Sequence, residues 1–124
     1  MGSYLRSGRG AGMSGGHVLC RVEDIPDGTA RGFDWPKGEV KVKILVARKG
    51  DRVFGYRNAC PHVGVPLEMD PDDFMSIDGR WLQCSTHGAQ FRVEDGMCII
   101  GPCAGRPLRS VPLTVIDGVV AVRE

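Results

Sequence analysis

Two short segments of the sequence each bring one cysteine close to one histidine. The first segment contains Cys60 and His62, and the second contains Cys84 and His87, so the spacings are Cys-x-His and Cys-x-x-His. A glycine follows each histidine within two residues, and glycine lets a short loop curl tightly. Thiolate and imidazole groups at such close spacing are typical metal ligands. The two segments therefore predict a metal site built from two loops.

The order of these ligands favours one kind of metal site over another. A zinc finger takes a Cys-x-x-Cys pair from one loop and two histidines from a helix. Here each loop mixes the two ligand types, and neither loop lies in a helical pattern. A cluster of two irons and two sulfides, with two cysteines on one iron and two histidines on the other, needs such a set. The alternative is a binding module in which zinc is held by the same four residues.

The two segments resemble the ligand boxes of the Rieske iron–sulfur family. The resemblance spans about residues 17–123 and is most specific between 60 and 102. It implies one [2Fe-2S] cluster per chain, with Cys60 and Cys84 on the inner iron and His62 and His87 on the outer one. The matching positions around these ligands are Gly64, Pro66-Leu67, Gly88, Phe91, Gly96 and Gly101-Pro102, the last pair resembling the loop that covers the cluster.

Within that family, the resemblance is to the small soluble ferredoxins of ring-hydroxylating oxygenase systems. The respiratory members clamp their loops with a disulfide, but Val65 and Thr86 stand at those positions. Those members also place hydroxyl donors around the cluster where this chain has Ala89 and Phe91. Losing hydrogen bonds to the sulfurs lowers the reduction potential, so a low-potential centre is expected. One departure is the connection of 21 residues between His62 and Cys84, which is longer than usual.

The resemblance implies a soluble electron carrier, with a flavin or NAD(P)H ferredoxin reductase as donor and a terminal oxygenase as acceptor. The chain is not expected to be an enzyme, because an oxygenase needs two further histidines and a carboxylate for its mononuclear iron. Only His17 remains beyond the predicted ligands. The alternative is a Rieske-fold subunit or module of a larger oxidoreductase.

The elements that position the two loops are predicted to be short antiparallel strands. Glycine and proline are frequent, with 18 and 8 in 124 residues, and long helical patterns are absent. Strands are predicted at residues 17–22, 40–49, 52–57, 111–116 and 119–123. Trp35 and Trp81 are predicted to lie in the core. The expected fold is all-β, a Rieske-like antiparallel β-sandwich with a small cluster-binding subdomain of two loops. Three Asp-Gly pairs predict hairpin turns, at Asp78-Gly79, Asp95-Gly96 and Asp117-Gly118.

The chain length fits a single domain. Residues 1–16 are rich in glycine and serine and are expected to form a flexible tail, while residues 17–124 form the Rieske domain, with its cluster-binding part at about 58–103. The net charge of +1 gives no basic face for nucleic acid. No apolar run is long enough to span a membrane, and no secretory signal is visible, so a cytoplasmic location is expected.

Other residues leave alternatives open. Cys20 is expected to be a small buried hydrophobe, and a disulfide between Cys98 and Cys103 is not expected in the cytoplasm. Cys103 is expected to pack beside the cluster, because the neighbouring Gly101-Pro102 resembles the loop that covers the cluster, and a redox role for Cys103 stays open. The connection between the boxes is acidic and is either a docking face for a basic partner or a solvated loop. Its acidic residues are Glu68, Asp70, Asp72, Asp73 and Asp78.

Overall fold

The computed structural model describes residues 17–37, 40–61, 67, 72, 74–76, 78–84 and 88–123. Among these residues the only helical element is a single 3-10 turn, η1 (Val22–Asp24). The strands are β1 (His17–Arg21), β2 (Ala30–Lys37), β3 (Val40–Lys49), β4 (Arg52–Arg57), β5 (Leu82–Gln83), β6 (Gln90–Phe91), β7 (Cys98–Ile100), β8 (Ser110–Val111), β9 (Leu113–Ile116) and β10 (Val119–Val122). No helix in this part of the chain is long and apolar enough to cross a membrane.

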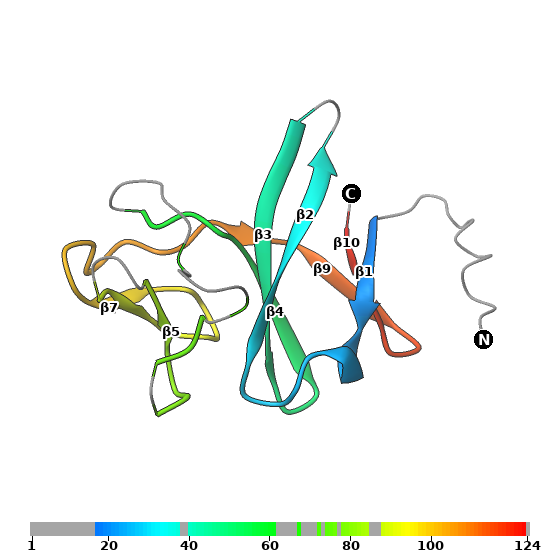
Figure 1. Cartoon of the computed structure of the whole chain (residues 1–124), viewed down its shortest axis with the longest axis horizontal. Helices are drawn as coiled ribbons and strands as arrows, with labels where there is room; N and C mark the ends of the chain where they lie inside the picture. The colour runs from blue at the N-terminus through cyan, green and yellow to red at the C-terminus, as the bar shows by residue number, and fades with distance from the viewer. Residues whose placement is uncertain are drawn as a thin grey trace.

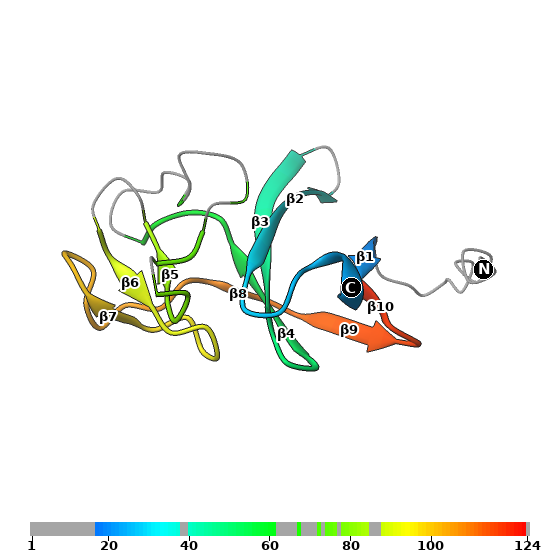
Figure 2. The ribbon, with the colours of Figure 1, turned by 60° about the horizontal axis from the view of Figure 1, so that its bottom comes forward.

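The strands form three antiparallel sheets (Figure 1). One has the order β1-β10-β9 and a second has the order β2-β3-β4-β8. We call these two sheets the framework. The third sheet, β5-β6-β7, belongs to the site lobe, which we define as the described residues between 58 and 103. Figures 1 and 2 agree that the four-stranded sheet lies between the site lobe and the three-stranded sheet. The prediction of an all-β antiparallel fold is confirmed.

Strand β3 joins the two halves because both of its faces are buried. Ile44 and Val46 point to one side and pack in cores shared with Val122 and Val120 of β10. Leu45 and Ala47 point to the other side and pack in the core of the site lobe. All four side chains are almost completely excluded from solvent, as expected where a strand carries a continuous apolar run. The site lobe is thus built directly on the back of the framework.

Long, regularly patterned strands agree with the sequence. Strands β3 and β4 have the predicted bounds, and β1 ends one residue earlier than predicted, where η1 begins. The Asp117-Gly118 turn joins β9 to β10, with Asp117 at φ 53° and Gly118 at φ 78°. The hairpin through Asp95-Gly96 joins β6 to β7, and that through Asp78-Gly79 precedes β5. All three hairpin turns are confirmed.

Three sequence-based expectations about the framework and its surroundings need correction. Strand β2 is not among the predicted strands, because Gly32, Asp34 and Pro36 all have low strand propensity. It forms nevertheless as an edge strand paired only with β3, where proline is tolerated. The predicted strand at 111–116 is two strands in different sheets, because Pro112 has no N–H to continue a ladder. Trp35 is buried as predicted, but Trp81 is only half-buried.

Candidate metal centre

Both predicted cysteine ligands lie in one apolar core. Cys60 follows strand β4 and is 1% exposed, and Cys84 follows strand β5 and is 0% exposed. Both belong to the cluster of buried side chains that includes Leu45 and Ala47 of β3. The predicted histidine ligands His62 and His87 lie outside the described residues. Among the described residues no three Cys, His, Asp or Glu side chains form a metal-binding group.

The first loop is closed by a side-chain amide. Asn58 Oδ1 accepts a hydrogen bond of 2.8 Å from the backbone N–H of Leu67. Asn58 is itself 6% exposed, and its own N–H donates to the Lys43 carbonyl on β3 at 2.9 Å. These contacts attach both ends of the segment that contains Cys60 to the central strand. Little in the sequence marks Asn58 as a residue of the site, apart from its position two residues before the Cys-x-His pair.

The second loop is closed by two backbone hydrogen bonds on Cys84. The N–H of Cys84 donates to the Ala89 carbonyl, and the N–H of Gly88 donates to the Cys84 carbonyl, each at 2.8 Å. Gly88 has φ of +71°, a left-handed conformation that glycine adopts without strain. Ala89 and Phe91 then return to the core with no exposed surface. The chain thus enters and leaves this loop at adjacent points.

A third loop, at the end of strand β7, packs against the second. Gly101 has φ of +109°, and a Cβ atom there would lie 2.7 Å from Cα of Ala89. The loop is held by hydrogen bonds from Ala104 N–H to the Gly101 carbonyl and from Gly105 N–H to the Cys98 carbonyl, at 3.1 and 2.9 Å. The Gly101-Pro102 segment, which the sequence predicts beside the two ligand loops, therefore packs against the second loop.

Cys98 and Cys103 are in direct contact, because the Cys103 thiol donates to Sγ of Cys98 at 3.0 Å. Burial raises the pKa of the Cys103 thiol to about 11; the Cys98 thiol acts in the same direction, and the Cys60 thiol opposes it. Cys20, predicted to be buried, is only half-buried on β1.

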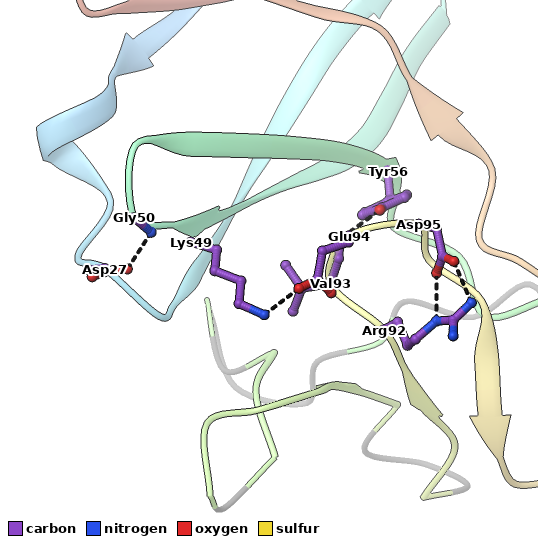
Figure 3. Close-up of polar contacts among 8 residues, drawn as sticks. All are labelled: Asp27, Lys49, Gly50, Tyr56, Arg92, Val93, Glu94 and Asp95. Carbon is purple, nitrogen blue, oxygen red and sulfur yellow. Dashed lines mark hydrogen bonds and ion pairs between the residues drawn. The ribbon is translucent and has the colours of Figure 1, made fainter.

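The site lobe is tied to the framework through the turn between β6 and β7 (Figure 3). The hydroxyl of Tyr56 on β4 donates a 2.7 Å hydrogen bond to the Val93 carbonyl, and burial raises the pKa of this tyrosine. Lys49 on β3 pairs with Glu94, and this hydrogen bond lowers the pKa of the carboxyl. Arg92 pairs with Asp95 within the turn and lowers the pKa of that carboxyl. The turn is therefore fixed to β3 and β4 by side chains.

Two of the acidic residues in the connection between the boxes make internal contacts. Asp72 Oδ1 accepts a 2.8 Å hydrogen bond from the N–H of Gly32 on β2. Asp78 Oδ1 accepts from the Ser76 hydroxyl at 2.6 Å, and this bond lowers the pKa of Asp78. These contacts give both residues structural roles. Glu68, Asp70 and Asp73 lie outside the described residues, so the docking-face alternative is not tested by the structure.

The two predicted ligands that the structure describes, Cys60 and Cys84, fit a buried iron–sulfur site. Cys60 and Cys84 are thiols in a common apolar core, which suits ligands of an inner, solvent-shielded iron. Each lies in a loop that is closed by hydrogen bonds to backbone N–H groups rather than by a helix or a long strand. The model of the family described as "Rieske [2Fe-2S] domain" matches residues 16–116 of the chain. The chain belongs to the Rieske [2Fe-2S] domain family.

Comparison with known proteins shows which members of the Rieske family this chain is similar to. The ferredoxin component of the p-cumate 2,3-dioxygenase system of Pseudomonas putida is 30% identical over 104 residues, which cover 84% of this chain and 81% of that protein. A chain from the complex of reduced oxygenase and oxidized ferredoxin in carbazole 1,9a-dioxygenase aligns with a TM-score of 0.67 and 27% identity, covering 86% of this chain and 90% of that one.

A third similar protein shares the fold. The ferredoxin of carbazole 1,9a-dioxygenase from Nocardioides aromaticivorans IC177 aligns with a TM-score of 0.66 and 23% identity, covering 86% of this chain and 96% of that one. Family membership confirms the predicted cofactor, a Rieske-type [2Fe-2S] cluster. The named ferredoxin components agree with the prediction of an electron-transfer component rather than an enzyme.

Proposed function

We propose that this Rieske protein carries single electrons from a flavin or NAD(P)H ferredoxin reductase to a terminal oxygenase. The observation that carries the proposal is the pair of buried thiols, Cys60 and Cys84, which two closed loops bring into one core. The similarity to ferredoxin components of dioxygenase systems, over more than four-fifths of both chains, supports the same role.

Cys60, His62, Cys84 and His87 are the proposed ligands of the cluster. When bound, the cluster supplies a centre that accepts and releases one electron. The residues of the chain exclude water from the cysteine side: Leu67, Phe74 and Phe91 are all 0% exposed and belong to the same core as the two thiols. A dry surrounding with few charges disfavours the additional negative charge of the reduced state.

A low reduction potential is proposed, because two side chains of the core around the thiols cannot donate hydrogen bonds to the cluster. Ala89 and Phe91 are completely buried in the core of the site lobe and bring no side-chain hydrogen-bond donor to it. Each such donor would stabilise the reduced state. A low potential suits acceptance of electrons from a flavin reductase and delivery to an oxygenase.

The domain arrangement and location follow from this role. Residues 17–124 are proposed to act as one Rieske domain with its cluster-binding part at about 58–103, and residues 1–16, proposed as a flexible tail, lie outside the described residues. A cytoplasmic location is proposed, where reduced nicotinamide is available to the reductase. A role as a module of a larger oxidoreductase is the second candidate, but the ferredoxin relatives are covered over most of their own length.

The experiment is reconstitution with a ring-hydroxylating oxygenase and its reductase, without their own ferredoxin. The p-cumate 2,3-dioxygenase components provide such a set. We expect NADH-dependent reduction of the Rieske protein and, on adding the oxygenase, oxidation of one electron per chain together with product formation. A cluster-loaded protein that is reduced by dithionite but by no reductase, and oxidised by no oxygenase, would contradict the proposed function.

A further inference from the structure

A cavity of about 410 Å³ lies between the framework and the site lobe. Its framework side includes Ala47 and Arg48, near the end of β3. Its site-lobe side includes Met75, Trp81 and Val93. Neither of the two proposed cluster ligands that the structure describes lines it. Cavities of this size are typical of small-molecule sites, and a molecule bound here would contact both regions at once.

The inner surface of the cavity is apolar. Ala47 and Val93 are 1% and 6% exposed, and both belong to the core of the site lobe. Met75 and Trp81 are half-buried, and Met75 packs against the same core. An apolar ligand would displace water from these surfaces, and an indole ring forms favourable contacts with other aromatic rings. The inner surface therefore favours a ligand that contains an aromatic ring.

The charged side chains that line the cavity are mostly basic. Among the described lining residues one, Glu94, is anionic and four are cationic: Arg48, Lys49, Arg80 and Arg92. Lys49 pairs with Glu94, and Arg92 pairs with Asp95, which lies outside the lining (Figure 3). Arg48 and Arg80 form no ion pair with a described residue. These two positive charges favour an anionic ligand.

Arg48 is held in place by neutral groups. Its Nε donates to the Gly50 carbonyl at 2.8 Å, and its Nη1 donates to the Ile25 carbonyl at 3.0 Å. The residue is half-buried, and an arginine that is shielded from water is normally paired with an acid. Arg80, by contrast, is exposed and also attracts the Asp78 carboxylate. Arg48 is therefore the more rigidly placed of the two cations, and a bound anion would balance its charge.

The backbone donors around the cavity distinguish between two classes of anion. Phosphate sites commonly use backbone N–H groups of glycine-containing turns. Here the N–H of Gly28 donates to the Arg48 carbonyl at 3.1 Å, and the N–H of Gly79 donates to the Ser76 carbonyl at 2.8 Å. These donors are engaged within the protein, so the recognition of an anion falls to the guanidinium groups, which match the geometry of a carboxylate.

We propose that this cavity is a binding site for a small aromatic carboxylate. The carboxylate group lies at Arg48 and Arg80, and the ring lies against Met75, Trp81 and Val93. The site goes beyond the proposed electron transfer and does not depend on it. A ligand that binds only the folded chain stabilises it, so the bound acid also strengthens the junction between the framework and the site lobe.

The test measures binding of 2-naphthoate to the full chain by isothermal titration calorimetry. 2-Naphthamide keeps the ring without the charge, and acetate keeps the charge without the ring. Each is expected to bind at least about tenfold more weakly than 2-naphthoate, because each loses one of the two kinds of contact. In proton–nitrogen NMR spectra, 2-naphthoate should shift the indole N–H signal of Trp81 and leave that of Trp35, which lies in a different core, unchanged.

Variants of the two cations locate the site. Arg80→Gln and Arg48→Met are each expected to weaken 2-naphthoate binding about tenfold. Arg31→Gln is the matched control, because Arg31 also lies over an aromatic ring, that of Phe33 at 5.3 Å, but does not line the cavity. Since Arg48 also holds two carbonyls, thermal unfolding must show that its variant is folded, and the exposed Arg80 provides the test without that requirement.

Three results would overturn the inference. They are the absence of 2-naphthoate binding at millimolar concentration, equal binding of 2-naphthamide or inorganic phosphate, and an equal loss of binding in Arg31→Gln and Arg80→Gln. None of them bears on the proposed function, which is tested by iron and sulfide content and by electron transfer.

Discussion

The framework and the site lobe are held together in different ways. Strands β3 and β2 of the framework contain ten and eight residues, and their ladder alone pairs eight residues of each. The strands of the site lobe contain only two or three residues. The site lobe depends instead on single contacts, such as the hydrogen bond between Asn58 and Leu67 and the packing of Gly101 against Ala89.

The difference teaches where single substitutions matter. The stability of a long ladder is distributed over many hydrogen bonds and side-chain contacts, so removing one of these interactions changes the geometry of the sheet little. A loop that is closed by one side chain loses its shape when that side chain is removed. The proposed ligands Cys60 and Cys84 lie in such loops, so cluster binding is expected to depend on contacts that contribute a small part of the total fold stability.

The largest expected effect comes from removing a proposed ligand in the site lobe. Cys84→Ala is expected to abolish the cluster, because the inner iron loses one of its two thiolates. Iron and acid-labile sulfide should fall to near zero, while the far-ultraviolet circular dichroism keeps its β signature. Cys20→Ala on β1 is the framework control and should retain full iron and sulfide. A Cys84→Ala protein with an intact cluster would remove Cys84 from the ligand set.

The second effect concerns the contact between the third loop and the second. Gly101→Ala is expected to cost about 3 kcal/mol of unfolding free energy, from the positive φ and from the clash of the new Cβ with Ala89. Gly105→Ala is the matched control, since its φ is +90° but nothing lies within 4 Å of the new Cβ. It should cost about 1 kcal/mol. Chemical denaturation measures both, and equal costs would contradict the role assigned to the Ala89 contact.

The third effect compares the same kind of hydrogen bond in the two regions. Asn58→Ala leaves the Leu67 N–H without its partner in a buried place, so a loss of about 2 kcal/mol and weaker cluster retention are expected. Asp27→Ala removes an equally long 2.8 Å bond to the Gly50 N–H on the exposed side of the framework. It should cost about 0.5 kcal/mol and leave cluster retention unchanged. A similar loss of cluster in both variants would contradict the claim that the site lobe depends on single contacts more than the framework does.

The smallest effect is the pH dependence of the ion pair that joins the regions. The folded-state pKa of Glu94 is lowered by Lys49, so the pair stabilises the fold above the unfolded-state pKa of about 4.3, and this contribution is lost as pH falls through the folded-state pKa. The side chains of Lys49 and Glu94 are 61% and 44% exposed, which limits the contribution to less than about 1 kcal/mol at pH 7.

Glu94→Gln measures this contribution. Its unfolding free energy should lie below that of the wild type at pH 7, and the two should converge as the pH falls below the folded-state pKa of Glu94. Lys49→Met should show the same convergence. A difference that grows toward low pH would contradict the sign of the pKa shift.

Sequence patterns predicted the framework because each strand repeats one physical preference many times. The apolar run of β3 and the Asp-Gly turn between β9 and β10 each indicate one structure without reference to the rest of the chain. The sequence-based predictions were wrong where a residue of low strand propensity lies within a strand or between two strands. Pro36 lies in an edge strand, and Pro112 passes the chain from one sheet to another.

The site lobe was predictable in its chemistry and less so in its geometry. Cys60 and Cys84 were predicted by their spacing to nearby histidines, and both are buried together as an inner pair of ligands requires. Asn58 was not recognised as a neighbour of the site, because its contact with Leu67 joins two segments of the chain through folding rather than through a local motif. The assignment of all four ligands, Cys60, His62, Cys84 and His87, remains a prediction from the sequence.

The measurement that tests the central claim most directly is cofactor analysis of the anaerobically purified chain. The account predicts two irons and two acid-labile sulfides per chain, and, after dithionite reduction, an electron paramagnetic resonance spectrum with the low average g value of a histidine-ligated cluster. Zinc without sulfide, or a reduced cluster with the g values of all-cysteine ligation, would contradict it.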